Sequence, residues 1–438
     1  MKNLKIKIDL GNIMLWYTTF VLCFFVGFLS FIRFILPTNI DKIFLSGTTV
    51  LAIIIYIVVK RKSIIENIVY SYVLLAVGMI CFAYANSAWS VDLLFLFASS
   101  IMLCIIALSE EKIIQIIKAA LLFLMIMDLF YGFVTIVCFL NGDFYTEKII
   151  PLFPWAIDRL IRQYNSGCIA GITSHYSTNA MFLSTGLLIA IAMFLKQKQK
   201  RYLLSAIILF VSLLMTGKRA HILFSAFAIF FIYFISLIKQ GLRRMILNTV
   251  VVMLITIIVA GVFFLLFPSL ATFIQRFKET IDAGDISLGR FDFWTLALNA
   301  FKENPLLGIG WKHYQIDINP GYDVHNVYLQ IICETGVVGA IIFFAWFILL
   351  YWKTLRNYIK IISCNNDNLL DDKYLVYFSF LYQTFFFLYC FTGNPLYETI
   401  MFVPYFISCM ITICFSKHMK GLEKNITLCK RGKIYKWW

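Results

Sequence analysis

Charged residues are scarce in this sequence. Asp, Glu, Lys and Arg make up only 14% of the 438 residues, whereas hydrophobic residues make up 61%. Soluble domains keep about a quarter of their residues charged, so this composition excludes a water-soluble protein. The chain has room for about twelve membrane-spanning helices, because each helix needs about 20 apolar residues.

Motifs of several common classes are also missing. The sequence contains no Walker-type phosphate loop and no G-x-S-x-G nucleophile elbow, so ATP-driven chemistry is not supported. Its 11 cysteines are scattered and form no C-x-x-C pair, so a zinc site is not expected either. We therefore expect neither a metal nor a cofactor.

Long apolar runs predict an all-α integral membrane protein with about twelve transmembrane helices. The runs lie near residues 13–36, 43–59, 68–84, 91–108, 113–140, 173–195, 202–215, 222–238, 245–267, 327–351, 374–391 and 400–415. This division gives helices 1 to 5 within 1–140, a first outer loop at 141–172, helices 6 to 9 within 173–267, a large outer loop at 268–326, helices 10 to 12 within 327–415, and a basic tail at 416–438. The edges leave room for eleven to thirteen spans.

The basic residues predict the orientation. Counting spans in order places both termini on one side of the membrane, and that side carries 25 of the 38 Lys and Arg residues. Cytoplasmic loops carry the excess of Lys and Arg, so both termini are expected in the cytoplasm. The net charge of +15 is then mainly a signal of topology, and nucleic-acid binding is not expected.

Three polar segments are assigned to the opposite, outer side. The first is a short turn at 216–221, TGKRAH. The second is LGRFDFW within the large loop, where apolar residues recur at helical spacing up to Phe301 and predict an amphipathic helix at the membrane interface. The third, DVHNVYL, leads into the span that begins near residue 327.

These segments supply Arg219, Arg290 and His325 to one face of the membrane. The planar guanidinium of arginine binds phosphate oxygens through two parallel hydrogen bonds. Histidine can take a proton from a hydroxyl group near neutral pH. An outer site with these residues is suited to glycosyl transfer from a lipid diphosphate carrier.

The same segments resemble a known family. The runs GRFDFWTLALNAFKENPLLGIGWKHY and HNVYLQIICETGVVG, between Gly289 and Gly339, are similar to the signature region of the O-antigen ligase and polysaccharide polymerase family. LLMTGKRAHILFSAF resembles the family's basic turn, although Lys218 stands where many members have Ser. GITSHYSTNAMFLS, at 171–184, resembles a further family segment.

The resemblance implies that Arg219 and Arg290 bind the undecaprenyl diphosphate of the donor and that His325 acts as the base on the acceptor. It also implies an inverting, metal-independent transfer in a fold of the GT-C-like kind found in lipid-dependent glycosyltransferases. The enzyme is then expected in the bacterial cytoplasmic membrane, with its active site on the outer face. We favour a polymerase of lipid-linked repeat units for a capsule, exopolysaccharide or O-antigen, for which a chain-length regulator is a candidate partner.

Supporting site residues are predicted from their positions beside the main three. They are Asn326, Glu334, Lys218, His175 and His221. Glu334 lies inside a span, where an acid is costly and needs a partner, and orienting His325 or an arginine is the role considered for it. Gly336 and Gly339 are expected to permit close helix packing.

Two other functions fit parts of the pattern. A ligase, which moves a finished polymer to another acceptor, needs the same donor site and the same base, so the sequence does not separate it from a polymerase. A lipid-linked sugar flippase is the alternative from another class, since twelve spans suit a transporter. Transporters place their key residues near the midplane, whereas the polar segments here are assigned to the outer side, which favours an enzyme.

Overall fold

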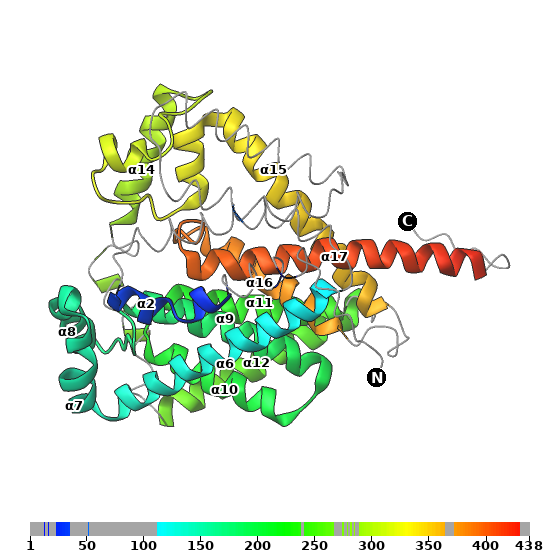
Figure 1. Ribbon diagram of the computed structural model, residues 1–438, viewed down its shortest axis with the longest axis horizontal. Helices are drawn as coiled ribbons and strands as arrows, with labels where there is room; N and C mark the ends of the chain where they lie inside the picture. The colour runs from blue at the N-terminus through cyan, green and yellow to red at the C-terminus, as the bar shows by residue number, and fades with distance from the viewer. Residues whose placement is uncertain are drawn as a thin grey trace, which may run out of the picture.

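The computed structural model describes residues 23–35, 112–237, 241–266, 289–363 and 372–429, together with single residues elsewhere. Within this part of the chain every regular element is a helix (Figure 1). Apart from one residue, the spans expected near 43–59, 68–84 and 91–108 lie outside the described residues.

Five of the described helices are long and apolar enough to cross a membrane. They belong to α6 (Lys112–Leu140), α9 (Tyr176–Gln197), α11 (Arg219–Ser236), α15 (Val327–Ser363) and α17 (Thr399–Cys429). Other apolar helices lie where the sequence predicts spans, and these are α2 (Leu29–Ile35), α10 (Lys200–Met215), α12 (Leu242–Leu266) and α16 (Lys373–Tyr389). The described part is thus an all-helical membrane protein, while the count of twelve spans stays a prediction.

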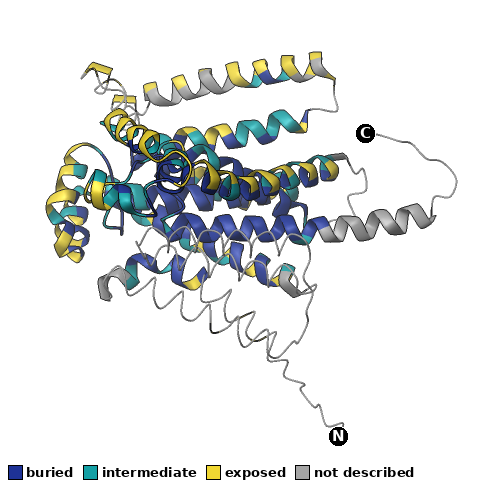
Figure 2. Cartoon of the chain, turned by 90° about the horizontal axis from the view of Figure 1, so that it is seen from above, coloured by how far each residue is buried: buried dark blue, intermediate teal, exposed yellow. Residues whose placement is uncertain are grey.

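Helix α9 is at the centre of the bundle. It packs against α6, α10, α11, α16 and α17, and most of its residues are buried. Figure 2 shows this buried interior as a dark blue core with exposed residues on its outside. Gly186 of α9 permits the close approach of α6, because a Cβ atom at Gly186 would lie 2.5 Å from the Cβ atom of Asp128.

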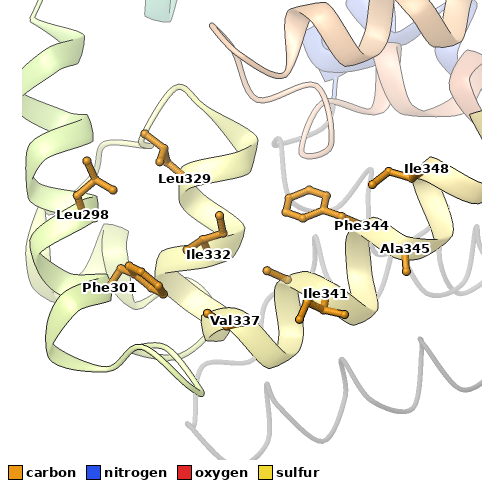
Figure 3. Close-up of a pocket in the computed structure, with 10 residues that line it drawn as sticks. Leu298, Phe301, Leu329, Ile332, Val337, Ile341, Phe344, Ala345 and Ile348 are labelled. Atoms are coloured by element: carbon orange, nitrogen blue, oxygen red, sulfur yellow. The ribbon is translucent and has the colours of Figure 1, made fainter.

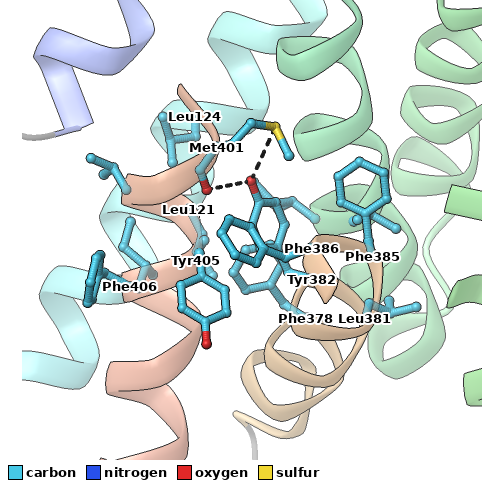
Figure 4. Close-up of a cluster of buried hydrophobic side chains, with 14 of the residues drawn as sticks. Leu121, Leu124, Phe378, Leu381, Tyr382, Phe385, Phe386, Met401, Tyr405 and Phe406 are labelled. Atoms are coloured by element: carbon cyan, nitrogen blue, oxygen red, sulfur yellow. Dashed lines mark hydrogen bonds between the residues drawn. The ribbon is translucent and has the colours of Figure 1, made fainter. Parts of the chain in front are cut away.

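Aromatic side chains fill the core between α16 and α17 (Figure 4). The rings of Phe386 and Tyr405 stack with their centroids 4.1 Å apart. The hydroxyl group of Tyr382 donates a hydrogen bond to the carbonyl oxygen of Met401 over 3.0 Å, so this buried polar group is satisfied. On the outside of the bundle α6 exposes large apolar side chains such as Phe133, which is 64% exposed, as expected of a surface that faces lipid.

A buried polar cluster links α15, α16 and α17. The Thr354 hydroxyl donates to the side-chain oxygen of Gln383 over 3.0 Å and lies 2.7 Å from the hydroxyl of Thr412. The amide nitrogen of Gln383 donates to Ser379 over 3.1 Å. Hydrogen bonds of this kind hold helices together where lipid offers no alternative partner.

The segments expected to form the two long loops lie towards one end of the bundle, which we call the loop end (Figure 1). The first segment folds as α7 (Gly142–Phe144), η1 (Tyr145–Ile149), η2 (Ile150–Leu152), η3 (Pro154–Ala156) and α8 (Ile157–Asn165). The second contains α14 (Arg290–Glu303), at the position of the expected amphipathic helix, and η6 (Tyr314–Ile318).

Helix α15 is not one straight helix. A continuous helix of its 37 residues would be about 55 Å long, well beyond the roughly 30 Å of a bilayer's apolar core. The helix is broken at Gly336, whose φ of 65° and ψ of −171° are not helical. Figure 1 shows its first part running across the bundle before the longer second part turns along it. His325 therefore precedes a short arm, and the long helix begins only after Gly336.

Residues 305–310 fill the break in α15. Four backbone hydrogen bonds join them to it: Ile309 N–H to Cys333 O (3.0 Å), Gly310 N–H to Glu334 O (2.9 Å), Val337 N–H to Pro305 O (2.9 Å) and Val338 N–H to Leu306 O (3.2 Å). The carbonyl and N–H groups that a helix break leaves without helical partners are thereby satisfied. The contact needs glycine on both sides, because a Cβ atom at Gly308 or Gly336 would lie within 2.5 Å of the opposite backbone.

Candidate functional site

The ends of several helices meet at the loop end. The backbone N–H of Val327, the first residue of α15, donates to the carbonyl oxygen of Cys390, just after α16, over 2.9 Å. The His221 ring of α11 lies 4.4 Å from the ring of Tyr389 of α16. The Tyr389 hydroxyl is hydrogen-bonded to Ser177 of α9. These contacts bring α9, α11, α15 and α16 together beneath the predicted site.

His325 is held in an uncommon backbone conformation immediately before α15. Its φ is +54°, in the left-handed region that few residues other than glycine adopt. Asn326 follows as the helix cap, and its side-chain oxygen accepts the backbone N–H of Leu329 over 3.1 Å. The His325 ring is nearly parallel to that of Phe293 in α14, with 6.2 Å between centroids. Asn326 thus has a capping contact at the start of α15, while its supporting role in the site stays a prediction.

The charges around His325 favour its neutral form. Burial lowers the pKa of its imidazole below the usual 6.5, and the positive charges of Arg290 and Lys218 lower it further. The Asp323 carboxylate acts in the opposite direction. A neutral imidazole can accept a proton.

Arg290 and Arg219 occupy equivalent positions in their helices. Arg290 is the first residue of α14, after Gly289 with φ +78°, and Arg219 is the first residue of α11. Both side chains are half-buried. A cation at a helix N-terminus opposes the helix dipole, so these arginines do not stabilise their own helices. The N–H groups of a first helical turn bind anions, and an arginine at that position adds a fork of charged donors.

Lys218 joins the basic turn to His325. It caps α11, its ammonium group lies 5.6 Å from the centre of the Tyr176 ring, and its charge affects His325. Arg219 is the next residue along the chain. Because the charges of Lys218 and Arg290 both act on His325, we call these three residues the charged cluster. The sequence assigned Lys218 only a supporting role.

His175 and His221 have clear structural contacts. His175 caps α9, where its Nδ1 accepts the backbone N–H of Ser177 over 3.0 Å. His221 is fully buried, and its Nδ1 lies 3.0 Å from the hydroxyl oxygen of Ser184. Contact of either histidine with a substrate stays a prediction.

The two acids near the end of the loop differ in their surroundings. Glu334 is 1% exposed, accepts a hydrogen bond from the Gln330 amide over 3.1 Å, and is hydrogen-bonded to the backbone of Lys312. Asp323, in contrast, is half-exposed and acts on the pKa of His325. The described contacts of Glu334 thus tie it to the loop, and the carboxylate that influences His325 is Asp323.

Tyr389, Ser177 and Phe293 were not found by reasoning from sequence. Each comes from a different helix, and each reaches the site only because helix ends pack together. Phe293 lies within the motif LGRFDFW, but its contact with His325 depends on how α14 is placed. The sequence signal that could have indicated Tyr389 is its position, as an aromatic residue at the predicted outer end of a span.

An apolar groove lies against the same elements (Figure 3). It has a volume of about 550 Å³ and lies between α14 and the two arms of α15. Its walls are formed by apolar side chains on these helices, namely Leu298, Phe301, Leu329, Ile332, Val337, Ala340, Ile341, Phe344, Ala345 and Ile348. Leu329, in the wall of the groove, is four residues after His325 in the sequence.

Among the residues that the structure describes, no group of three or more His, Cys, Asp or Glu could hold a metal ion. The part of the chain that the structure describes is thus an all-helical membrane protein, and His325, the cations Lys218 and Arg290 and an apolar groove lie towards its loop end.

A comparison with protein families gives a match to part of the chain. The sequence model of the O-antigen ligase family matches residues 203–344, which run from α10 into α15. The matched segment contains Lys218, Arg219, Arg290 and His325, and it confirms the resemblance to the O-antigen ligase and polymerase family. No curated protein matches the chain.

Proposed function

We propose that the protein is a membrane glycosyltransferase that joins undecaprenyl-diphosphate-linked oligosaccharides on the outer face of the bacterial cytoplasmic membrane. The observation that carries the proposal is the cluster of His325 with Arg290 and Lys218. A base and phosphate-binding cations are both required for transfer from a lipid diphosphate, and here they come from segments far apart in sequence. The product is a surface polysaccharide, such as a capsule, exopolysaccharide or O-antigen.

His325 acts on the acceptor in the proposed step. Its neutral imidazole takes the proton of an acceptor hydroxyl, whose oxygen attacks the anomeric carbon of the donor sugar. A new carbon–oxygen bond forms, and the bond between that carbon and the diphosphate breaks. Undecaprenyl diphosphate leaves with the bonding electrons. Attack from the side opposite the diphosphate inverts the configuration at the anomeric carbon.

The donor diphosphate is held by Arg290 and Arg219 together with Lys218. Two of these residues open helices, so backbone N–H groups and guanidinium groups can converge on one anion. Cations also stabilise the charge that develops on the leaving diphosphate in the transition state. The apolar groove between α14 and α15 receives the adjoining part of the polyprenyl chain. One donor lipid would then contact the cations through its diphosphate and the apolar groove through its polyprenyl chain.

A polymerase and a ligase remain the two forms of this activity. We favour the polymerase, and the ligase is the second candidate because the matched family is described as O-antigen ligase. The deciding experiment is the analysis of lipid-linked saccharides in a strain that lacks the gene. Accumulation of single repeat units supports a polymerase, long unattached polymers support a ligase, and unchanged saccharides contradict both.

The proposed orientation, with both termini in the cytoplasm, has its own test. Cysteine introduced by Ile316→Cys, at the loop end, should react with a membrane-impermeant maleimide in intact cells. Gln199→Cys, in the turn between α9 and α10, should react only after permeabilisation. Labelling of the unsubstituted protein in parallel gives the background from its 11 native cysteines. The reverse labelling pattern would contradict an outer active site.

A further inference from the structure

A second surface lies beside His325, distinct in character from the cationic cluster. The Tyr322 ring is 57% exposed and lies 5.8 Å from the ring of Phe293. The Phe293 ring in turn lies 6.2 Å from that of His325. An exposed aromatic face thus continues directly from the base to the outside of the loop.

Hydrogen-bonding side chains border this aromatic face. The Gln315 amide donates a hydrogen bond to the Asp323 carboxylate, and the Lys312 ammonium donates to the Gln315 oxygen over 2.9 Å. A carboxylate has about four acceptor positions on its two oxygens, so one amide donor leaves capacity for a hydroxyl group. Asp323 and Gln315 are both half-exposed.

We propose that Tyr322, Asp323 and Gln315 form the subsite for the acceptor saccharide and present its reacting hydroxyl group to His325. The proposal rests on the glycosyltransferase function proposed above and names the part of that site which binds the acceptor. A pyranose ring has one largely apolar face and a rim of hydroxyl groups. An aromatic ring with neighbouring amide and carboxylate groups matches that chemistry on both counts.

The distribution of charge separates this subsite from the donor side. Lys218 and Arg290 are cations and suit the diphosphate, whereas Asp323 is an acid that would repel it. A neutral sugar carries no charge to be repelled, and its hydroxyl groups can donate to the carboxylate. The Phe293 ring, 6.2 Å from that of His325 and 5.8 Å from that of Tyr322, links this subsite to the base.

Binding measurements with two probes test the subsite. The acceptor probe is the saccharide released by mild acid from the lipid-linked pool of the deletion strain, and the donor probe is undecaprenyl diphosphate. Saturation-transfer NMR on the full-length protein in detergent reports saccharide binding. We expect Tyr322→Ala and Asp323→Asn to weaken it at least about tenfold, the loss of roughly one good contact, while neither variant weakens undecaprenyl diphosphate binding. Ile316→Ala, at another exposed position of the same loop, is the matched control.

The outcomes separate the subsite from the enzyme function. Saccharide binding that is unchanged in both variants, in a protein that still extends lipid-linked units, overturns the subsite and leaves the function in place. An equal loss for both probes also overturns it, because the surface would then shape the whole site. A wild-type protein that binds neither probe and forms no polymer overturns the function and the subsite together. Thermal midpoints in detergent identify any variant that fails to fold.

Discussion

Arg290 lowers the pKa of His325, although one residue opens α14 and the other precedes α15. An anion bound to Arg290 would offset its charge and so raise the pKa of His325. We therefore expect donor binding to make His325 a stronger base. The imidazole of His325 would reach its full basicity only when the diphosphate is bound.

His325→Ala should abolish polymer formation while the protein remains folded in the membrane, because the side chain is proposed to do chemistry rather than packing. Polymer length on gels and the amount of protein in the membrane fraction are the measurements. His313→Ala, at a histidine paired with Asp317 on the nearby loop, should retain polymer. Normal chain lengths in His325→Ala would rule out the assigned base.

The pH dependence of activity should follow the lowered pKa of His325. The neutral imidazole is the active form, so activity at limiting donor concentration, which reports the free enzyme, should fall as the pH drops through a pKa below 6.5, the usual value. Lys218→Met removes a charge that lowers this pKa, and the acidic limb should move to higher pH. Asp323→Asn removes the opposing charge and should move it to lower pH. Rates of polymer formation between pH 4.5 and 8 give the profiles (roughly the range in which histidine titrates), and identical profiles for all three proteins would contradict His325 as the titrating base.

Arg290→Lys should fail to support polymer formation even though it keeps the positive charge. Lysine offers a single ammonium group, whereas arginine can bind two phosphate oxygens at once. The loss should appear mainly as weaker binding of undecaprenyl diphosphate. Lys302→Arg, in the last turn of the same helix, provides the control. Retained activity in Arg290→Lys would show that charge alone is sufficient.

Gly336→Ala should destabilise the protein by about 1 to 3 kcal/mol or more, since its backbone conformation is almost restricted to glycine. The new Cβ atom would also lie 2.3 Å from the carbonyl group of Leu306. The melting temperature in detergent measures the effect. Gly261→Ala in α12 is the matched control, because nothing lies within 4 Å of a Cβ atom there. Equal melting temperatures for the two variants would show that the break does not depend on glycine.

Ala345→Trp should obstruct the groove between α14 and α15 and weaken binding of the donor lipid. Ala345 is an exposed residue of the groove wall, so the larger side chain can be added without disturbing the core. The concentration of lipid-linked donor needed for half-maximal rate should rise. Leu349→Trp, at an exposed position outside that wall, should leave it unchanged. An unaltered requirement in Ala345→Trp would argue against the lipid occupying the groove.

The sequence predicted those features that depend on local pattern. Apolar runs predicted the positions of α6, α9 and α17, and helical spacing predicted α14. Periodicity could not predict the break in α15, because an apolar run of spanning length continues past Gly336 and the break depends on hydrogen bonds to the distant residues 305–310. Gly336 was expected to serve helix packing, and it instead ends one helical arm against a loop.

The residue types of the candidate site could be predicted from local motifs, but the contacts between those residues could not. His325 and Arg290 lie in motifs that the sequence displays, and their chemistry could be inferred from residue type. Asp323, which also acts on His325, is only two residues away from it in the sequence. The electrostatic coupling between His325 and Arg290, in contrast, depends on the angle between α14 and the first arm of α15. That angle is set by contacts between distant segments, and no local pattern encodes it.

Residues 305–310 and the break at Gly336 form one hydrogen-bonded unit, which limits how this region can be exchanged between related enzymes. A graft that replaced the loop but left residues 333–338 unchanged would separate partners that supply each other's backbone hydrogen bonds. The two sequence motifs, N-P-x-x-G-x-G and E-x-G-x-x-G, should therefore be inherited and transplanted as a pair. The loop surfaces around the two motifs can then vary, and with them the specificity for the saccharide, without a change in the backbone contacts that position His325.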